Sequence, residues 1–487
     1  MRPASRMRGL ASATMAVMLS GCATVGPNFK APEPSTLKDG SGYAMAGDYE
    51  TNGLRLEAVS RPAWWKSFGS TDLNGVMDLA LAGNPTTAEA EASLARAMAS
   101  SAATEGSQHL QGDLRANAQR ERINSQQFGF STFPGFPSFG SPTINLFSIG
   151  GTVSYDLDLF GGRKRSVEQG QAQTEAAKWR ADAAYLSVSG NVAMHVMRIA
   201  AIRSQIIAIE AVIADDNRII EISRLAQLKG GEAPSASLGP RAQRAEDLGG
   251  GPALVRDLAA SRHQLALLVG KSPAEWSPPD FDISSLKIPA ELPVSIPSSL
   301  VRHRPDIRAA EAELHAATAA VGVAVSNRYP NIRLSANLTQ TTRTPEDLFG
   351  YSASGWNLMS GLSAPLFNGG TLKARQRAAE ADARVAMARY QQTVLRAFVQ
   401  VSDALAALGT DQRVMAAADE GVAIAQANLA EVRAAYRLGG ASQLQVIEGE
   451  RRMNRIRRAV AQAQGQQLVD LVSLYAATAT DWREPQH

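Results

Sequence analysis

The chain reads Tyr155-Asp156-Leu157-Asp158-Leu159-Phe160-Gly161-Gly162 at one place and Leu362-Ser363-Ala364-Pro365-Leu366-Phe367-Asn368-Gly369-Gly370 at another. Each stretch ends an alternating apolar segment with Leu-Phe and a glycine pair, and each precedes almost seventy residues without proline. Further upstream, residues 111–117 and 331–337 also follow one pattern. A repeat of this length indicates that the two halves of the chain have the same arrangement of helices and strands. We therefore predict one unit, strand–strand–long helix–turn–helix, present twice.

The proline-free runs, Arg163–Lys229 and Thr371–Leu438, are rich in Ala, Arg, Glu and Gln, which favour helix. A helix of that length extends about 100 Å at 1.5 Å per residue. Such a helix lacks a globular core around it, so we expect coiled-coil packing against neighbouring helices. The small Ala side chains allow close approach.

Each long run ends at a glycine pair, which is a suitable helix stop. A second helix is then expected to return, over Leu238–Leu268 and over Ser442–Ala477. The pattern thus predicts two helical hairpins, with their turns at Gly230-Gly231 and Gly439-Gly440. Pro240 and the segment 249–252, which is Gly-Gly-Gly-Pro, predict a break early in the first return helix.

The segment Thr143–Phe160 alternates between apolar and polar residues over its whole length. Three further segments, near residues 114, 334 and 358, show the same period of two. That period suits a barrel strand with lipid on one side and water on the other, and a soluble two-sided sheet is the alternative. Four strands are too few for an open pore, since known membrane barrels have about eight or more. Several copies must therefore share one barrel, and three copies would give twelve strands.

The amino-terminal residues indicate export. Three arginines within the first eight residues precede an apolar stretch and Leu19-Ser20-Gly21-Cys22, which is typical of a secretory signal peptide. Its end resembles a bacterial lipobox, in which the cysteine is lipidated, and an ordinary signal with an incidental thiol is the alternative. By the sorting rule of such lipoproteins, Ala23 favours the outer membrane. Cys22 is the only cysteine, so no intrachain disulfide can form.

The net charge bears on one class of partner, nucleic acid. The formal net charge is +3, and the signal peptide contributes three arginines and no acid, so the remaining chain is neutral. Nothing in that balance indicates nucleic acid. No segment after the signal approaches 18 consecutive apolar residues, so no spanning helix is expected.

Several short motifs resemble the TolC-like outer-membrane factors, in the NodT-type lipoprotein branch that serves efflux pumps. They are Cys22 followed by 25–32 (VGPNFKAP), Trp64-Trp65, Asn84-Pro85, 300–311 (LVRHRPDIRAAE) and 364–370 (APLFNGG). The resemblance implies an α+β membrane protein and a homotrimer. Its twelve-stranded outer-membrane barrel would continue into a twelve-helix coiled-coil periplasmic tunnel with a small equatorial domain.

The resemblance also implies a gate at the periplasmic end of the tunnel. The family's Tyr-x-x-Gly motif corresponds to Tyr436–Gly439. By the same correspondence Leu444 is the apolar constriction, Glu448 the carboxylate of an acidic ring, and Arg451 a tie to a neighbouring helix. Glu stands where Asp is usual, and Gln445 replaces a second Asp. An ordinary surface pair between Glu448 and Arg451 is the alternative. The hairpin tips at Gly230, Gly231, Gly439 and Gly440 are the expected adaptor contacts.

These patterns predict the following order of segments: signal peptide 1–21, lipid-anchored and equatorial segment 22–71, first repeat 72–269, equatorial linker 270–298, second repeat 299–477 and tail 478–487. The loop 128–139 carries aromatic residues between Pro and Gly, and is expected outside the barrel or as an unstructured tip.

The function predicted from these features is a passive exit duct, not an enzyme. Small toxic compounds or drugs would reach it from an inner-membrane pump of the resistance–nodulation–division (RND) class through a periplasmic adaptor. The alternatives are a type I protein-secretion duct and a trimeric coiled-coil surface protein. His195 and His315 each stand alone, so no metal site is expected. No cofactor is expected beyond a covalent lipid on Cys22 in the outer membrane.

Overall fold

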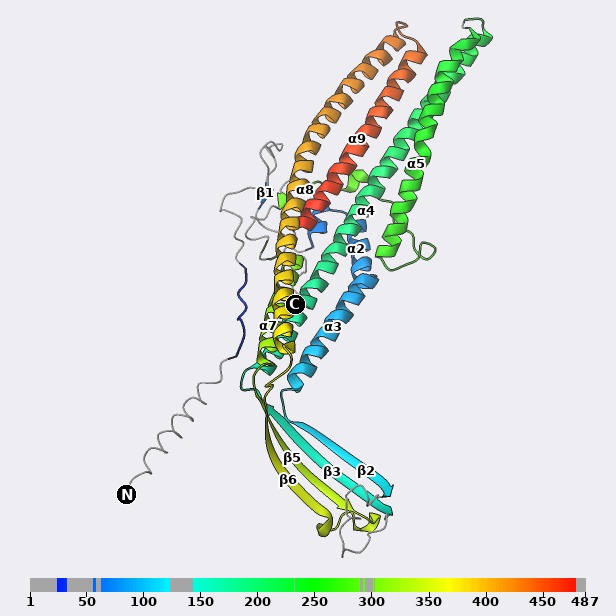
Figure 1. The fold of residues 1–487 in the computed structure, drawn as a ribbon. Helices are drawn as coiled ribbons and strands as arrows, with labels where there is room; N and C mark the ends of the chain where they lie inside the picture. Colours follow the sequence, from blue (N-terminus) through cyan, green and yellow to red (C-terminus); the bar gives the residue numbers. More distant parts are fainter. Residues whose placement is uncertain are drawn as a thin grey trace, which may run out of the picture. The chain divides into compact units, whose positions relative to one another are not determined.

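The computed structural model describes residues 24–32, 56–57, 63–122, 143–231, 233–289, 292–293, 301 and 303–478 (Figure 1). The chain divides into two compact units. Unit 1 comprises Met1–Ala31, Ala95–Glu175 and Ala312–Ala388, and unit 2 comprises Pro32–Leu94, Ala176–Glu311 and Arg389–His487. Cys22 and the aromatic loop 128–139 lie outside the described residues.

The predicted duplication is confirmed by the order of the elements, since helix–strand–strand–helix–helix occurs twice. In the first half these are α3 (Pro85–Gly106), preceded by the short α2 (Thr71–Gly83), then β2 (Gln111–Arg122), β3 (Thr143–Leu157), α4 (Gly162–Leu228) and α5 (Leu238–Leu268). In the second half they are α7 (Pro305–Ser326), β5 (Asn331–Thr342), β6 (Ser354–Ser363), α8 (Thr371–Arg437) and α9 (Gln443–Thr478). Both long helices, α4 and α8, have 67 residues.

The predicted break in the first return helix is wrong. Helix α5 runs through Pro252 and the preceding glycines without interruption. Pro240 is the third residue of α5, where the backbone N–H has no intrahelical partner to lose. Pro252 removes one helical hydrogen bond inside α5, and the neighbouring turns maintain the helix.

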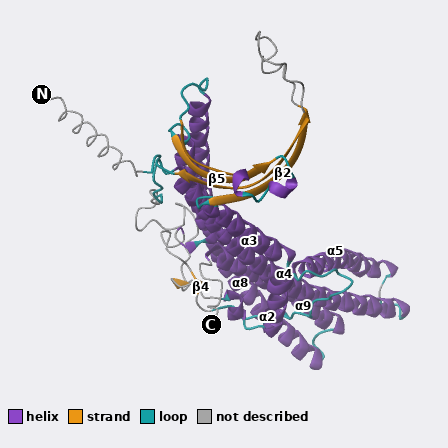
Figure 2. Ribbon diagram, turned by 90° about the horizontal axis from the view of Figure 1, so that it is seen from below, coloured by secondary structure: helices purple, strands orange, loops and turns teal. Residues whose placement is uncertain are grey.

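The four longer strands of unit 1 form one antiparallel sheet in the order β2-β3-β5-β6, which Figure 2 shows as a curved arc. Strand β3 ends at Leu157, three residues before the predicted end. The chain turns there, because Leu159 donates to the carbonyl of Leu157 and Gly161 adopts a φ of 73°. Glycine suits this left-handed conformation, so the first glycine of the pair is needed to enter α4.

The register places apolar and polar residues in separate rows across the sheet. One row consists of Leu114, Gly151, Leu338 and Trp356, which are direct partners on adjacent strands. The next row consists of Asp113, Thr152, Asn337 and Asn357. Because successive residues point to opposite faces, these rows lie on opposite sides of the sheet.

Each face has a distinct character. On the polar face, Thr152 donates to the Asn337 side-chain oxygen at 2.6 Å, and the Asn337 amide donates to Asn357 at 2.7 Å. On the apolar face, Trp356 is 76% exposed and Leu358 is 75% exposed. A contiguous exposed apolar face of this kind marks a surface that contacts a membrane or another protein.

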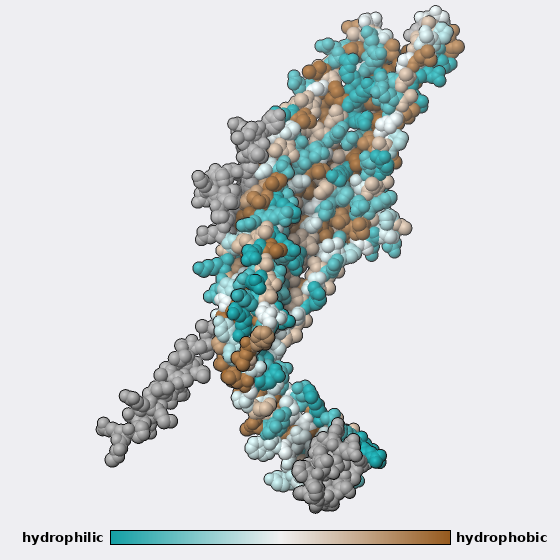
Figure 3. Space-filling view, viewed as in Figure 1, coloured by the Kyte–Doolittle hydropathy of each residue, from teal (hydrophilic) through white to brown (hydrophobic). Residues whose placement is uncertain are grey.

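The helical hairpins of unit 2 lie in the order α8, α9, α4, α5 (Figure 1). Figure 3 shows hydrophobic and hydrophilic residues interspersed over these helices. Helices α9 and α4 approach closely at Gly465, since a Cβ there would lie 2.2 Å from the Cβ of Ala201. Glycine is therefore required at this crossing. No helix in the described part of the chain is long and apolar enough to cross a membrane.

Two short contacts join segments that the sequence assigns to an equatorial region. Strands β1 (Leu56–Glu57) and β4 (Leu292–Pro293) pair in parallel. The backbone N–H of Lys287 donates to the carbonyl of Phe68 at 2.9 Å. Nearby, Trp64 is 1% exposed and stacks on Tyr475 of α9 with ring centroids 5.2 Å apart. The Trp64-Trp65 motif thus attaches the segment that precedes α2 to the end of α9.

Candidate gate and hairpin tips

The hairpin tips contain the predicted glycine turns. Gly230 and Gly439 have φ angles of 74° and 77°, and each follows the end of a long helix. The next glycine closes the turn in both cases: Gly231 donates to the Ala226 carbonyl at 2.9 Å, and Gly440 donates to Ala435 at 2.8 Å. These bonds satisfy carbonyls that the helix end leaves free. The two tips are therefore built alike, as a duplicated unit requires.

The start of α9 is fixed by a reciprocal cap. Ser442 Oγ accepts from the Gln445 backbone N–H at 3.2 Å, and Gln445 Oε1 accepts from the Ser442 N–H at 2.7 Å. This is a capping box, with glutamine in place of the more usual glutamate. The side chain of Gln445, which the resemblance places in the acidic ring, therefore serves to begin the helix within this chain.

The remaining predicted gate residues lie on the two helices that flank this tip. Tyr436 lies in the last turn of α8 and is 45% exposed. Leu444 is half-buried and Glu448 is exposed. Leu444 and Glu448 are four residues apart on α9 and so share a helix face. One chain brings these groups to the same end of the hairpin, and a ring requires further copies.

Arg451 pairs with two carboxylates of the first hairpin rather than with Glu448. Its Nε lies 2.7 Å from Oδ1 of Asp216 on α4, and its Nη2 lies 3.6 Å from Oδ2 of Asp247 on α5. Arg455 donates to the same Asp247 oxygen at 2.6 Å. The N–H groups of Arg451 do not point at the oxygens, so these contacts are ion pairs and not aligned hydrogen bonds.

Burial determines which of the two carboxyls, Asp216 or Asp247, takes up a proton first. The Asp216 side chain is 2% exposed. Its burial raises the pKa of Asp216 to about 6, against the attraction of Arg451 and together with the repulsion of Asp247. Burial also acts to raise the pKa of Asp247, and the hydrogen bond from Arg455 reverses this, so that the pKa of Asp247 falls below its usual value. Asp216 is thus the member that protonates first on acidification.

A second polar cluster lies beside the first. Glu450 pairs with Arg433 of α8 at 2.6 Å and with Arg218 of α4 at 3.3 Å. Asn454 donates to Asp215 at 2.7 Å. These groups line a cavity of about 440 Å³ that is bordered by α4, α8 and α9. Together the two clusters link α9 to every other helix of the hairpins.

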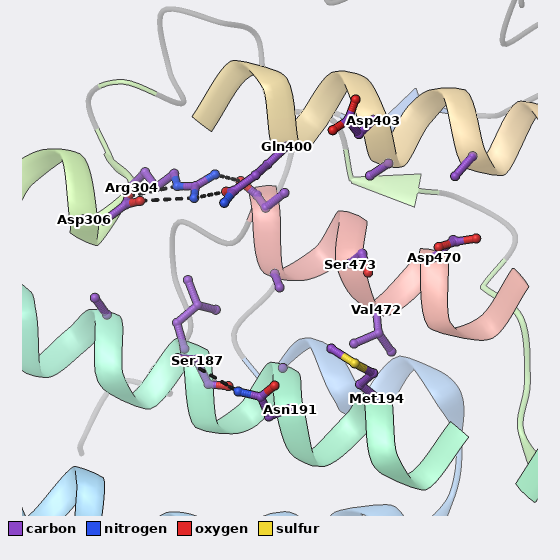
Figure 4. Close-up of a pocket in the computed structure, with 17 residues that line it drawn as sticks. Ser187, Asn191, Met194, Arg304, Asp306, Gln400, Asp403, Asp470, Val472 and Ser473 are labelled. Carbon is purple, nitrogen blue, oxygen red and sulfur yellow. Dashed lines mark hydrogen bonds and ion pairs between the residues drawn. The ribbon is translucent and has the colours of Figure 1, made fainter. Parts of the chain in front are cut away.

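A larger cavity, of about 640 Å³, lies between α4, α8, α9 and the start of α7 (Figure 4). Arg304 is 7% exposed at its edge. Its guanidinium donates to Asp306, to the Gln400 side chain and, at 3.0 Å, to the carbonyl of Ala477. The motif at residues 300–311 therefore supplies a buried arginine whose hydrogen bonds connect α7, α8 and α9.

Two carboxyl groups meet across α8 and α9 near this cavity. Asp411 is 9% exposed. Burial, together with the charge of Asp470 and a hydrogen bond to it, raises the pKa of Asp411 to about 7. No basic group contributes to this shift. Asp411 therefore takes up a proton near neutral pH, which removes its repulsion of Asp470.

Among the described residues, no three His, Cys, Asp or Glu side chains are grouped so as to hold a metal ion. Burial and the nearby Arg198 lower the pKa of His195, so this imidazole is neutral. His315 lies in unit 1 against Glu168, with 3.1 Å between its Nε2 and a carboxylate oxygen.

Comparison with known proteins agrees with this geometry. A family model described as "Outer membrane efflux protein" matches residues 76–270 and 296–480. The chain is 26% identical to Nodulation protein T of Rhizobium leguminosarum bv. trifolii, over 92% of each chain. It is 27% identical to the Cation efflux system protein CusC of Escherichia coli, over 73% of this chain and 77% of that one. The solved structure of the outer-membrane channel OprN superposes with a TM-score of 0.81 at 26% identity, over 94% of this chain and all of that one. Since the family match covers both repeats, the chain belongs to the outer membrane efflux protein family.

Proposed function

We propose that this protein is the outer-membrane exit duct of a tripartite efflux pump. Three copies would combine their sheets into a twelve-stranded barrel and their hairpins into a twelve-helix tunnel. The duct supplies no energy and performs no chemistry; it opens and conducts. The observation that carries this proposal is the four-stranded sheet with one exposed apolar face, one polar face and two free edges.

The free edges support closure by further copies. Strands β2 and β6 each have one neighbour within the described sheet. In lipid, unpaired backbone groups cost several kcal/mol each, so only a closed sheet is tolerated. One edge meeting the other edge of the next copy is a head-to-tail contact that closes as a ring. With three copies the ring reaches twelve strands, which is within the known range for membrane barrels.

The outer helices of the hairpins support the same ring. Helix α8 bears a set of exposed apolar residues that fall within about 100° of one face at 3.6 residues per turn: Val385, Leu395, Val399, Val414 and Ile424. Helix α5, at the other side of the four, bears a comparable set: Leu238, Leu248, Val255 and Leu267. These two faces are suited to meet between adjacent copies, where coiled-coil packing would bury both.

Lipid on Cys22 and insertion in the outer membrane complete the proposed setting. The lipobox pattern and Ala23 support both. The family description supports the outer membrane.

Small toxic compounds or drugs are the proposed cargo, delivered by an RND pump through a periplasmic adaptor. One relative is named for nodulation and another for cation efflux, and neither name identifies the cargo of this chain. The glycine tips are the proposed adaptor contacts because they end both hairpins. A protein-secretion duct is the second candidate, and a structural surface protein the third.

Cross-linking from the tips tests the function. A photoreactive residue at Ala441 or Ala233, in cells, is expected to capture a periplasmic adaptor encoded with a proton-driven pump. The same residue at Ala459, further along α9, is the control and is expected to capture less. Capture of the adaptor of an ATP-driven exporter would establish protein secretion instead. Capture of no adaptor from either tip would favour the structural protein.

The gate assignment makes a separate prediction. Replacing both Leu444 and Glu448 with alanine is expected to raise the resting conductance of the purified protein in a planar bilayer, because it removes the apolar constriction and the carboxylates that select cations. Cation selectivity is expected to fall as well. Gln443→Ala in the same helix turn is the matched control. Unchanged conductance in the double variant would remove these residues from the gate.

A further inference from the structure

The residues that follow the lipidation motif are held on unit 1 by a buried arginine. Arg165, in the first turn of α4, is 3% exposed. Its guanidinium donates to the carbonyl of Val25 at 3.2 Å, to the carbonyl of Gly26 at 3.4 Å and to Oδ1 of Asn28 at 2.6 Å. The fourth acceptor is Glu168, at 2.7 Å. Three of the four acceptors thus come from residues 25–28.

A second set of contacts fixes the same segment along its length. The Val25 N–H donates to the carbonyl of Phe160 at 3.1 Å, just beyond the end of β3. Phe29 stacks on the His315 ring of α7, with centroids 4.4 Å apart and planes inclined by 15°. His315 in turn contacts Glu168. The segment is therefore held at both of its ends by groups from α4 and α7.

The approach of this segment to the protein is close. A Cβ at Gly26 would lie 2.5 Å from Cα of Gly322 in α7, and a Cβ at Gly322 would lie 2.8 Å from the Arg165 side chain. A Cβ at Gly161 would lie 2.5 Å from Thr24. Glycine at these three places allows the segment to lie against the backbone, with Arg165 between them.

The energetics favour a permanent contact. A guanidinium that is 3% exposed has lost its water and must find acceptors in the protein. If residues 25–28 left, Arg165 would retain Glu168 and lose the other three acceptors. Water would have to replace these three acceptors, so the docked segment is what completes the hydrogen bonding of the buried guanidinium. The segment therefore completes the structure of unit 1.

We propose that Arg165, Glu168 and His315 form a docking site for residues 24–29, and that this site fixes the lipid-bearing end of the chain at the junction of β3 and α4. The inference rests on the proposed lipidation of Cys22. An extended chain spans at most about 3.5 Å per residue, so the two steps from Thr24 limit Cys22 to about 7 Å from the docked segment. The acyl chains and the end of the sheet then share one membrane boundary. Docking couples anchoring to strand insertion, because an anchored chain already holds its sheet at the membrane surface.

Lengthening the tether tests this coupling without disturbing the docking site. Six Gly-Ser residues inserted between Ala23 and Thr24 keep the lipid and every docking contact, and extend the tether from two residues to eight. Effective concentration falls roughly as the −3/2 power of tether length, so the rate of insertion is expected to fall roughly eightfold. The rate is measured as the appearance of heat-resistant oligomer in phosphatidylethanolamine–phosphatidylglycerol vesicles. The same insert between Ser41 and Gly42, beyond the docked segment, is the matched control and is expected to leave the rate unchanged.

Arg165→Gln tests the docking itself. A photoreactive residue at Lys30 is expected to cross-link to α4 or α7 in the parent protein and not in the variant, and insertion is expected to slow. Lys164→Gln removes an exposed charge one residue away and is expected to change neither. An unchanged insertion rate with the lengthened tether would overturn the proposal, even if Arg165→Gln misfolds. Mass spectrometry of the amino terminus separates the two failures, because an unacylated Cys22 would refute the anchor and not the docking.

Discussion

Arg451→Met is expected to lower the unfolding temperature of the detergent-solubilised protein and to loosen α9 from α4 and α5. The substitution leaves the carboxylates of Asp216 and Asp247 without their shared cation, and the Asp216 side chain is 2% exposed. Breaking a buried pair by removal of one partner costs about 3–5 kcal/mol. Differential scanning fluorimetry at pH 7.5 measures the loss of stability, and planar-bilayer recording measures whether the resting conductance rises.

Lowering the pH is expected to reduce the loss of stability that Arg451→Met causes. The charge of Arg451 lowers the pKa of Asp216, which is about 6 in the parent protein, so without Arg451 this carboxyl is expected to take up its proton at a higher pH. The neutral form needs no cation, so the difference from the parent protein shrinks as the pH falls. Adding Asp216→Asn and Asp247→Asn to Arg451→Met is expected to restore much of the stability. Arg452→Met, which removes the next and exposed arginine, is the control. Equal effects of Arg451→Met and Arg452→Met would show that the ion pairs contribute nothing.

Asp411→Asn is expected to stabilise the protein at pH 8 and to have little effect at pH 4. The pKa of Asp411 is raised to about 7, so folding favours its protonated form. The stability that comes from this proton is fully present below the pKa of the unfolded chain, near 4, and is lost as the pH rises through 7. A shift of about three units corresponds to at most about 4 kcal/mol. Thermal unfolding between pH 4 and pH 8 therefore measures a flatter profile for the variant.

Asp403→Asn is the matched control for this profile. Asp403 lies on the same helix as Asp411 and lines the same cavity as Asp470, but its side chain is exposed. Its replacement is expected to leave the pH profile of unfolding unchanged. Asp470→Asn should reproduce only part of the effect of Asp411→Asn, since it removes the repulsion between the two carboxyls but leaves Asp411 buried. A pH profile of Asp411→Asn that matches the parent protein would show that protonation of Asp411 contributes nothing to stability.

The elements of the fold follow closely from the sequence because local signals determine them. The long helices begin and end within one residue of the positions set by their glycine pairs and by the absence of proline. The strands follow from period-two alternation, and the register then places the predicted faces correctly. The break expected in α5 was wrong because proline in the first turn of a helix removes no hydrogen bond, and one further proline is offset by the rest of a 31-residue helix.

The contacts of the site depend on helix packing, which the sequence does not reveal. Arg451 stands out in a basic run, but its partners lie more than 200 residues earlier, on two other helices. Only the relative register of the hairpins brings them together. Arg165 did carry a local signal: a cation in the first turn of a helix is unfavourable to the helix dipole, which indicates a compensating set of acceptors. The raised pKa of Asp411 results mainly from burial, which no sequence motif indicates.

Because α9 crosses α4 closely at Gly465, a small tilt of α9 about this point would move its far end by a larger distance. At this crossing Gly465 of α9 contacts Ala201 of α4, and neither residue has a long side chain that can change its conformation. The two helices therefore resist sliding along each other but can tilt. Gly465 and Gln443 are separated by 22 residues of α9, or about 33 Å at 1.5 Å per residue. Over about 33 Å, a tilt of about 5° about the crossing displaces the start of α9 by about 3 Å. A small tilt at the crossing therefore produces a larger displacement at the far end of α9, where the proposed gate residues Leu444 and Glu448 lie.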